Sequence, residues 1–177
     1  MRQMLLQGLL RRPLTEKLPD AETESVALLH ELDIAAQRRL GRSLAIRMVD
    51  AGSCNGCELE IQALGNPFYD LERFGLRFVA SPRHADVLLV TGPVTRNMHA
   101  ALLRTHAAMP SPKWVVAAGG CACNGGLFAA SPHCMGGAGA VLPVDVTIAG
   151  CPPTPPDLLR GLLALLRRPP VSRRTGR

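Results

Sequence analysis

The amino-acid sequence predicts a doubly wound, three-layer α/β domain with a mostly parallel sheet. From residue 44 onward, short apolar runs alternate with segments of helical periodicity, which is the order of elements in βαβ units. The run 87–91 is apolar almost throughout, as expected of a parallel strand that is buried on both faces. A chain of 177 residues with 47% hydrophobic and 19% charged residues can bury one ordinary core.

The elements follow in order from periodicity and from the residues that end each run. A first helix is expected over 22–40, where Leu29, Ala36 and Leu40 lie on one stripe and Gly41 stops the pattern. Strands are expected over 44–49, 76–80, 87–91, 113–118 and 144–148. Helices are expected over 58–64, 69–74, 95–107 and 156–166. The glycine-rich segment 119–139 has little periodicity and is expected to be a loop.

Single residues support several of these boundaries. Pro67 ends the helix 58–64, and Gly92 begins the turn between the third strand and the next helix. Pro155 suits the first turn of the last helix, where Asp157 is favourable beside the positive end of the helix dipole. The chain is therefore expected to divide into a helical extension over 1–42, the α/β domain over 43–168 and a basic tail over 169–177.

The N-terminal segment 1–10 is apolar on one face, and Arg2, Arg11 and Arg12 lie beside it. Such a segment suits a membrane surface or a groove on a partner, and docking on its own domain is the alternative. Residues 13–19 are expected to form a linker.

Charge and composition narrow the classes of partner. The net charge is +6, and much of it lies at the ends of the chain, which suggests an acidic partner or anionic lipid headgroups. Aromatic residues make up only 3%, which leaves little for stacking on bases, so no nucleic-acid partner is expected.

No apolar run approaches the roughly 20 residues that span a bilayer. The twin arginine at residues 11–12 is followed by a polar segment, not by the apolar core of a secretory signal. We therefore expect a cytoplasmic protein, whose thiols are kept reduced. Its six cysteines then suggest metal binding or redox chemistry before disulfides.

Four cysteines follow predicted strands in glycine-containing loops. Cys54 and Cys57 come after the strand 44–49, Cys121 after 113–118 and Cys151 after 144–148. Because the carboxyl ends of parallel strands open on one edge of a sheet, these four thiols are expected to converge. The helix near residue 58 points its positive end at this edge, which is expected to favour thiolates.

Four convergent thiolates with small neighbours suit a [4Fe–4S] cluster. The glycines expected to supply room and N–H donors are Gly52, Gly56, Gly119, Gly120 and Gly150. A zinc site, a thioredoxin-like pair formed by Cys54 and Cys57, and buried thiols without metal are the alternatives. Cys123 and Cys134 are expected to be packing or surface residues, and Cys123 is the substitute if Cys121 is not a ligand.

Four segments of the sequence resemble a known family. They are DAGSCNGCELEI at 50–61, PRHADVLLVTG at 82–92, GC at 120–121 with GG at 125–126, and PVDV at 143–146 followed by GCPP at 150–153. They resemble the small, cluster-bearing subunit of membrane-bound [NiFe] hydrogenases of the hydrogenase-4 and formate hydrogenlyase type. That small subunit is homologous to the 20 kDa (B) subunit of respiratory complex I, NADH-quinone oxidoreductase.

The resemblance covers roughly residues 44–166 and implies a flavodoxin-like domain with one [4Fe–4S] cluster. Its ligands would be Cys54, Cys57, Cys121 and Cys151. The chain would transfer electrons beside a large catalytic subunit (complex I 49 kDa-like), a ferredoxin-like iron–sulfur subunit and membrane-arm subunits. The complex would lie on the cytoplasmic face of the inner membrane, with this chain peripheral.

Two other functions stay open. A complex I component would pass electrons to quinone, and a zinc-stabilised assembly module would have no redox role. The complex I 20 kDa subunits carry adjacent cysteines at the first pair, whereas Asn55 and Gly56 separate them here, which favours the hydrogenase branch.

Overall fold

A computed structural model of the chain describes residues 22–168. Its five strands form one parallel sheet with the order β2-β1-β3-β4-β5. They are β1 (Leu44–Asp50), β2 (Leu76–Phe78), β3 (Val87–Thr91), β4 (Trp114–Ala118) and β5 (Val146–Ile148). This is the strand order of flavodoxin-like doubly wound folds, so the predicted fold class is confirmed.

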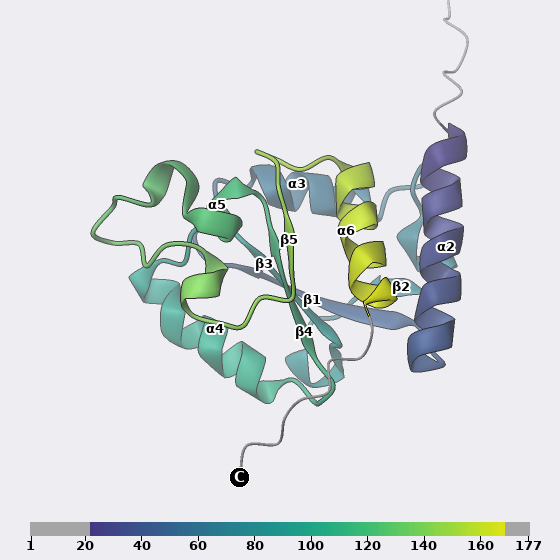
Figure 1. Cartoon of the computed structure of the whole chain (residues 1–177), viewed down its shortest axis with the longest axis horizontal. Helices are drawn as coiled ribbons and strands as arrows, with labels where there is room; N and C mark the ends of the chain where they lie inside the picture. The colour runs from purple at the N-terminus through teal and green to yellow at the C-terminus, as the bar shows by residue number, and fades with distance from the viewer. Residues whose placement is uncertain (1–21, 169–177) are drawn as a thin grey trace, which may run out of the picture.

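Helices cover both faces of this sheet. The α-helices are α2 (Glu22–Leu40), α3 (Gly56–Ala63), α4 (Arg96–Ala108), α5 (Gly120–Asn124) and α6 (Pro155–Arg167). Short 3₁₀ helices are η1 (Leu71–Phe74), η2 (Pro82–His84), η3 (Gly126–Phe128) and η4 (Ala138–Ala140). Figure 1 shows α2, α3 and α6 on one side of the sheet and α4 and α5 on the other.

The two faces of the sheet bury two separate apolar cores. Val87 and Leu89 of β3 face the helices α2, α3 and α6, whereas Leu88 and Val90 face α4 and the segment after β4. Side chains alternate between the faces of a strand, so a strand covered on both sides must be apolar throughout. This explains why the run 87–91 lacks the alternation of a half-exposed strand.

Helix α2 belongs to the first core. Leu29, Leu32 and Ala36 of α2 are fully buried in it, together with Leu159 and Leu162 of α6. The helix that the sequence assigned to an extension therefore completes one layer of the domain. The segments 1–10, 13–19 and 169–177 lie outside the described residues. Among the helices of residues 22–168, none is long and apolar enough to cross a membrane.

Several elements differ in detail from the prediction. The expected helix 69–74 is a single 3₁₀ turn, because Asp70 adopts a left-handed conformation before it. The expected loop 119–139 begins with the one-turn helix α5 and contains two 3₁₀ turns. Helix α6 begins one residue early, at Pro155, behind a capping box in which Thr154 and Asp157 bind each other's backbone N–H.

Candidate functional site

Four parallel strands end level with one another, and their carboxyl ends form one edge of the sheet. Asp50 pairs with Thr91, Thr91 with Ala118, and Ala118 with Ile148. The cysteines follow this row closely: Cys54 lies between β1 and α3, Cys57 in the first turn of α3, Cys121 in α5 and Cys151 after β5. The register of the sheet thus brings the four predicted cysteines to the same edge.

The first cysteine loop is held by one carboxylate. Asp50 Oδ1 accepts hydrogen bonds from the backbone N–H groups of Gly52, at 2.7 Å, and Ser53, at 2.6 Å. Ser53 Oγ then accepts the N–H of Asn55 at 2.9 Å, and Asn55 enters α3 in a left-handed conformation. This chain of bonds fixes a tight turn, which leaves Cys54 exposed at its tip.

The loop after β3 packs directly on the first cysteine loop. The carbonyl of Ala51 accepts hydrogen bonds from both the backbone N–H and the hydroxyl of Thr95, each at 2.9 Å. A Cβ at Gly92 would lie 2.4 Å from Ser53 N, and one at Gly52 would lie 2.3 Å from Thr95 Cγ2. Only glycine permits this approach, so the loop that carries Cys54 and Cys57 is fixed from two sides.

Two other glycines make room for sulfur atoms. A Cβ at Gly119 would lie 2.5 Å from Cys57 Sγ, and a Cβ at Gly126 would lie 2.7 Å from Cys121 Sγ. Both glycines have positive φ angles, 92° and 52°, which L side chains rarely adopt. The backbone after β4 therefore passes so close to the two inner thiols that a side chain could not fit between.

The expected N–H donors are partly engaged elsewhere. Gly119 N–H donates to the carbonyl of Ile148 at 2.8 Å, and Gly120 N–H donates to the carbonyl of Gly150 at 2.7 Å. Gly52 N–H is bound to Asp50. These three glycines provide room and hold the loops together, and the expectation that they donate to sulfur is wrong, because the sheet and the Asp50 turn use their N–H groups.

The thiols are close enough to affect one another's ionisation. Burial, followed by the Glu58 carboxylate and the thiols of Cys54, Cys121 and Cys151, raises the pKa of Cys57 to about 11. Burial also raises the pKa of Cys121, followed by the effects of Cys151 and Cys54. The expectation that the helix dipole favours thiolates is wrong for Cys57, because burial and neighbouring negative charge outweigh the dipole.

The two spare cysteines lie in different surroundings. Cys123 packs against the core on the α4 side, and its Sγ is 3.6 Å from the carbonyl of Ile148 and 3.8 Å from that of Ala117. Its pKa is raised by burial, and no other thiol contributes to that shift. Cys134 forms an isolated backbone bridge with Thr95, and it makes the smallest contribution to the raised pKa of Cys121.

Glu58 is a site residue whose burial the sequence did not reveal. Its side chain is only 4% exposed, and Oε2 accepts a hydrogen bond from Ser53 Oγ at 2.5 Å. Oε1 is buried without a hydrogen-bond partner among the described residues. A carboxylate in the first turn of a helix usually faces solvent, so only the neighbouring Ser53 could have signalled an inward position.

The donor set distinguishes two kinds of metal group. Among residues 22–168, no three His, Cys, Asp or Glu side chains are grouped closely enough to hold a single metal ion. A tetrahedral zinc site requires sulfurs only about 3.8 Å apart, from Zn–S bonds of about 2.3 Å. In a cubane each thiolate binds a different iron, so the sulfurs stand further apart. Four thiols around a glycine-lined edge therefore fit a cubane better than one ion.

Apolar side chains near this edge are exposed. Leu127, in η3 directly after the Cys121 loop, is 94% exposed, and Phe128 beside it is half exposed. Leu59 of α3 and Met135 of the same long loop are also exposed. Exposed apolar side chains that gather near a site indicate a surface for another protein.

The fold and this site define a flavodoxin-type domain that presents four thiols at one sheet edge, an arrangement suited to a metal cluster. Residues 54–165 match the family model "NADH ubiquinone oxidoreductase, 20 Kd subunit". The chain belongs to this family of oxidoreductase subunits, and the resemblance found in the sequence is confirmed.

The relatives of this chain include both hydrogenase-type subunits and NADH-quinone oxidoreductase B subunits. Formate hydrogenlyase subunit 7 of Escherichia coli is 43% identical over 149 residues, which are 84% of this chain and 57% of that protein. The probable membrane-bound hydrogenase subunit mbhJ of Pyrococcus furiosus is 45% identical over 73% of this chain and 77% of its own length. The NADH-quinone oxidoreductase B subunit of Carboxydothermus hydrogenoformans is 48% identical over 63% of this chain and 68% of its own length. The chain thus spans little more than half of formate hydrogenlyase subunit 7.

A solved structure has the same fold. It is a chain of the membrane-bound sulfane sulfur reductase, described as an archaeal respiratory membrane complex. The two chains are 36% identical, with a TM-score of 0.64 over 77% of this chain and 74% of the other. Relatives of this chain are therefore parts of multisubunit complexes bound to membranes.

Proposed function

We propose that this chain is the electron-transfer subunit of a membrane-associated oxidoreductase and holds one [4Fe–4S] cluster through Cys54, Cys57, Cys121 and Cys151. The observation that carries the proposal is the convergence of these four thiols, from three loops, at one level sheet edge. A cubane in this position would supply one-electron transfer. The protein would supply its ligands, its enclosure and its distance from a partner's redox centre.

The residues around the thiols have separate tasks. Asp50 and Ser53 hold the loop of Cys54 and Cys57, and Gly119 and Gly126 leave space beside the two inner sulfurs. At neutral pH Cys57 carries its proton, because its pKa is about 11. Binding to iron must therefore displace that proton, which makes loading of the site less favourable as the pH falls.

Two observations support a hydrogenase-type complex. The first pair of cysteines is separated by Asn55 and Gly56, which favours the hydrogenase branch, and formate hydrogenlyase subunit 7 matches over 84% of this chain. Catalysis would belong to a large hydrogenase-type subunit that covers the cysteine edge and contacts Leu127 and Phe128. The complex would also contain a ferredoxin-like subunit and membrane-arm subunits, and would lie on the cytoplasmic face of the membrane.

Transfer of electrons to quinone is the second candidate function. NADH-quinone oxidoreductase B subunits match this chain with 47–49% identity, although over shorter segments. The partner decides between these functions, because a quinone reductase and a hydrogenase differ in the large subunit. Affinity purification of the chain from its native cell, with identification of the large subunit that accompanies it, separates them.

Metal analysis of anaerobically purified protein tests the cluster. We expect about four irons and four acid-labile sulfides per chain, and an EPR signal at low temperature after reduction. Replacing Cys54, Cys57, Cys121 or Cys151 with serine should remove or degrade the cluster, whereas Cys134→Ser should retain it. Stoichiometric zinc without sulfide would refute the proposal. Loss of iron from Cys123→Ser but not from Cys121→Ser would show that Cys123, and not Cys121, is the third ligand.

A further inference from the structure

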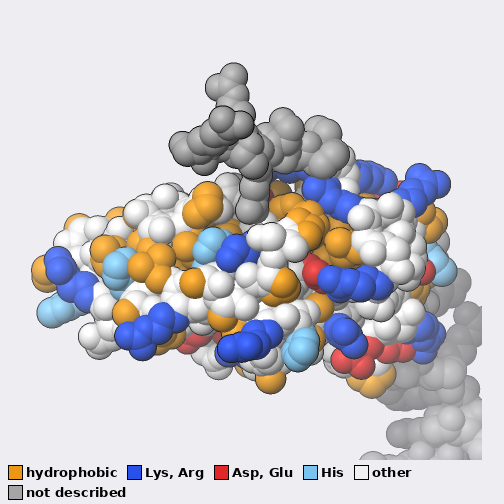
Figure 2. All heavy atoms as spheres, turned by 90° about the horizontal axis from the view of Figure 1, so that it is seen from below, with side chains coloured by type: hydrophobic (Ala, Val, Ile, Leu, Met, Phe, Trp, Pro, Cys, Tyr) orange, Lys and Arg blue, Asp and Glu red, His pale blue; other side chains and the backbone are white. Residues whose placement is uncertain are grey.

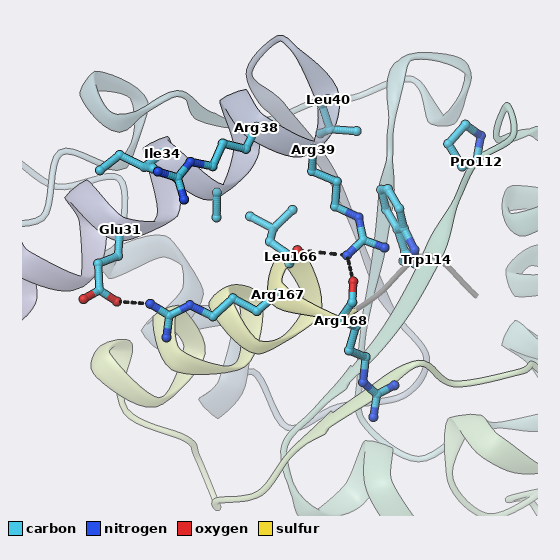
Figure 3. Close-up of a pocket in the computed structure, with 11 residues that line it drawn as sticks. Glu31, Ile34, Arg38, Arg39, Leu40, Pro112, Trp114, Leu166, Arg167 and Arg168 are labelled. Carbon is cyan, nitrogen blue, oxygen red and sulfur yellow. Dashed lines mark hydrogen bonds and ion pairs between the residues drawn. The ribbon is translucent and has the colours of Figure 1, made fainter. Parts of the chain in front are cut away.

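A surface groove lies at the amino edge of the sheet, at the opposite end from the cysteines. It is formed where α2 and α6 end and β4 begins, and has a volume of about 740 Å³. Ile34, Leu40, Trp114 and Leu166 give it an apolar floor (Figure 3). Ile34 is 50% exposed, so part of this floor is open to solvent.

The rim of the groove is basic. Arg38 and Arg39 come from α2, and Arg167 and Arg168 come from the end of α6, while Glu31 is the one acidic residue of the lining (Figure 3). Figure 2, which views the molecule from below, shows several groups of Lys and Arg side chains on this face and fewer Asp and Glu side chains. The surface therefore favours a ligand that carries negative charge.

One arginine is fixed in place and shapes the wall of the groove. Arg39 Nη1 donates to the carbonyls of Leu165, at 2.9 Å, Leu166, at 2.9 Å, and Arg168, at 2.5 Å. Its guanidinium also lies 4.7 Å from the centre of the Trp114 ring. These contacts satisfy carbonyls at the end of α6 and hold one side of the groove before anything binds.

Two other arginines of the rim are accessible to a ligand. Arg38 is exposed and has no ion pair or hydrogen bond with another residue of the described range 22–168. Arg167 pairs with Glu31 at 2.6 Å, but both side chains are at least half exposed, and such surface pairs contribute little to stability. A carboxylate that reaches the rim could therefore bind Arg38 and compete with Glu31 for Arg167.

We propose that the groove receives an acidic, amphipathic segment of a partner subunit, with an apolar side chain on Ile34 and Trp114 and carboxylates on Arg38 and Arg167. The proposal rests on the proposed function only in taking the chain as one member of a complex. A flat bilayer would reach the rim and leave the apolar floor uncovered. The tail 169–177 is basic, so its charge opposes the rim.

Cross-linking within the purified complex tests the occupant. A photoreactive phenylalanine derivative is placed at Ile34, and the same group is placed at Leu103 of α4 as a control. We expect the Ile34 probe to label another subunit, in a peptide with at least two carboxylates near an apolar residue, and the Leu103 probe not to label that peptide. Products with lipid, with residues 1–21 or 169–177 of this chain, or with no other molecule would overturn the proposal.

Charge reversal tests the recognition chemistry. The double variant Arg38→Glu/Arg167→Glu should bind the labelled partner about tenfold or more weakly, since like charges then face each other. Arg104→Glu on α4 is the matched control and should bind as the unmodified chain does. Reversing the carboxylates of the labelled peptide to lysines should restore binding to the double variant. Unchanged affinity of the double variant would contradict the proposal.

The iron content of the same samples separates this inference from the proposed function. Because the groove lies at the opposite edge from the thiols, the double variant should hold as much iron and sulfide as the unmodified chain. Low iron in every sample would argue against the cluster while leaving the cross-linking result intact. Wild-type iron with unchanged partner binding would argue against the groove alone.

Discussion

Replacing Gly119 with alanine should disturb the thiol site directly, because the added methyl group would meet a sulfur atom. The new Cβ would lie 2.5 Å from Cys57 Sγ, whereas ordinary contacts begin at 3.4 Å. The sulfur would have to move by about 1 Å, although a metal ligand tolerates only about 0.2 Å. The backbone of Gly119, with φ 92° and ψ 152°, also lies in a region that only glycine adopts readily, which adds about 1–3 kcal/mol of strain.

The neighbouring Gly120 offers a matched control in the same loop. A Cβ there would meet only the carbonyl of Gly150, at 3.7 Å, which is an ordinary contact. Both variants are purified anaerobically and compared by iron and sulfide content, by EPR and by urea unfolding. We expect Gly119→Ala to lose most of its iron and about 1–3 kcal/mol of stability, and Gly120→Ala to keep both. A Gly119→Ala protein with full iron and an unchanged signal would refute the close approach of Cys57 to this backbone.

Three further predictions concern the partner surface, a helix end and the thiols. Leu127→Asp should leave the fold intact, since the side chain is 94% exposed, but should reduce the amount of large subunit that co-purifies. The control Leu103→Asp on α4 should not reduce that amount. Equal yields of the large subunit with both variants would contradict this role of Leu127. Asp157→Asn should cost about 1 kcal/mol in urea unfolding at pH 7, because the carboxylate belongs to the capping box of α6. The hydrogen bond from the N-cap threonine lowers the pKa of Asp157 in the folded protein. The stabilisation is therefore present above the unfolded pKa and is lost as the pH falls through the lower folded pKa. A difference in unfolding free energy between Asp157→Asn and the unmodified chain that persists in acid would exclude this cause. In protein prepared without metal, iodoacetamide at pH 8 should label the exposed Cys54 well before Cys57. The labelling rate of Cys57 should rise only as the pH approaches the pKa of its thiol, about 11. Equal labelling rates at pH 8 would show that Cys57 is not protonated at that pH.

The sheet could be predicted because every strand carries a strong local signal. The apolar run 87–91 requires a strand covered on both faces, and alternation with helices requires parallel pairing. The positions of Cys54, Cys121 and Cys151 after strands then place them at one edge without further information. The glycines of the cysteine loops were also a sound signal for close packing, since a Cβ at Gly119 would lie 2.5 Å from Cys57 Sγ of another loop.

The rest depends on contacts between distant segments, which a sequence pattern does not contain. The raised pKa of Cys57 results from burial and from thiols on other loops, so the local helix dipole gave the wrong direction. The inward position of Glu58 depends on its hydrogen bond with Ser53. The groove depends on α2 meeting α6, as in the bond between Arg39 and Leu165, which lie 126 positions apart. Helix α5 is a single turn within a glycine-rich segment, too short to produce a period.

The level strand ends also set an order for the maturation of this protein. The loop of Cys57 is carried by β1 and the loop of Cys121 by β4, and these two strands are joined only through β3. Their thiols cannot meet until all three strands have associated, and such long-range parallel pairing is a slow part of folding. On the proposed function, iron and sulfide would therefore be delivered to a chain that is already folded, while its carboxyl edge is still uncovered. A large subunit that covered this edge earlier would shield the thiols, so the proposed cluster would be loaded between folding and assembly.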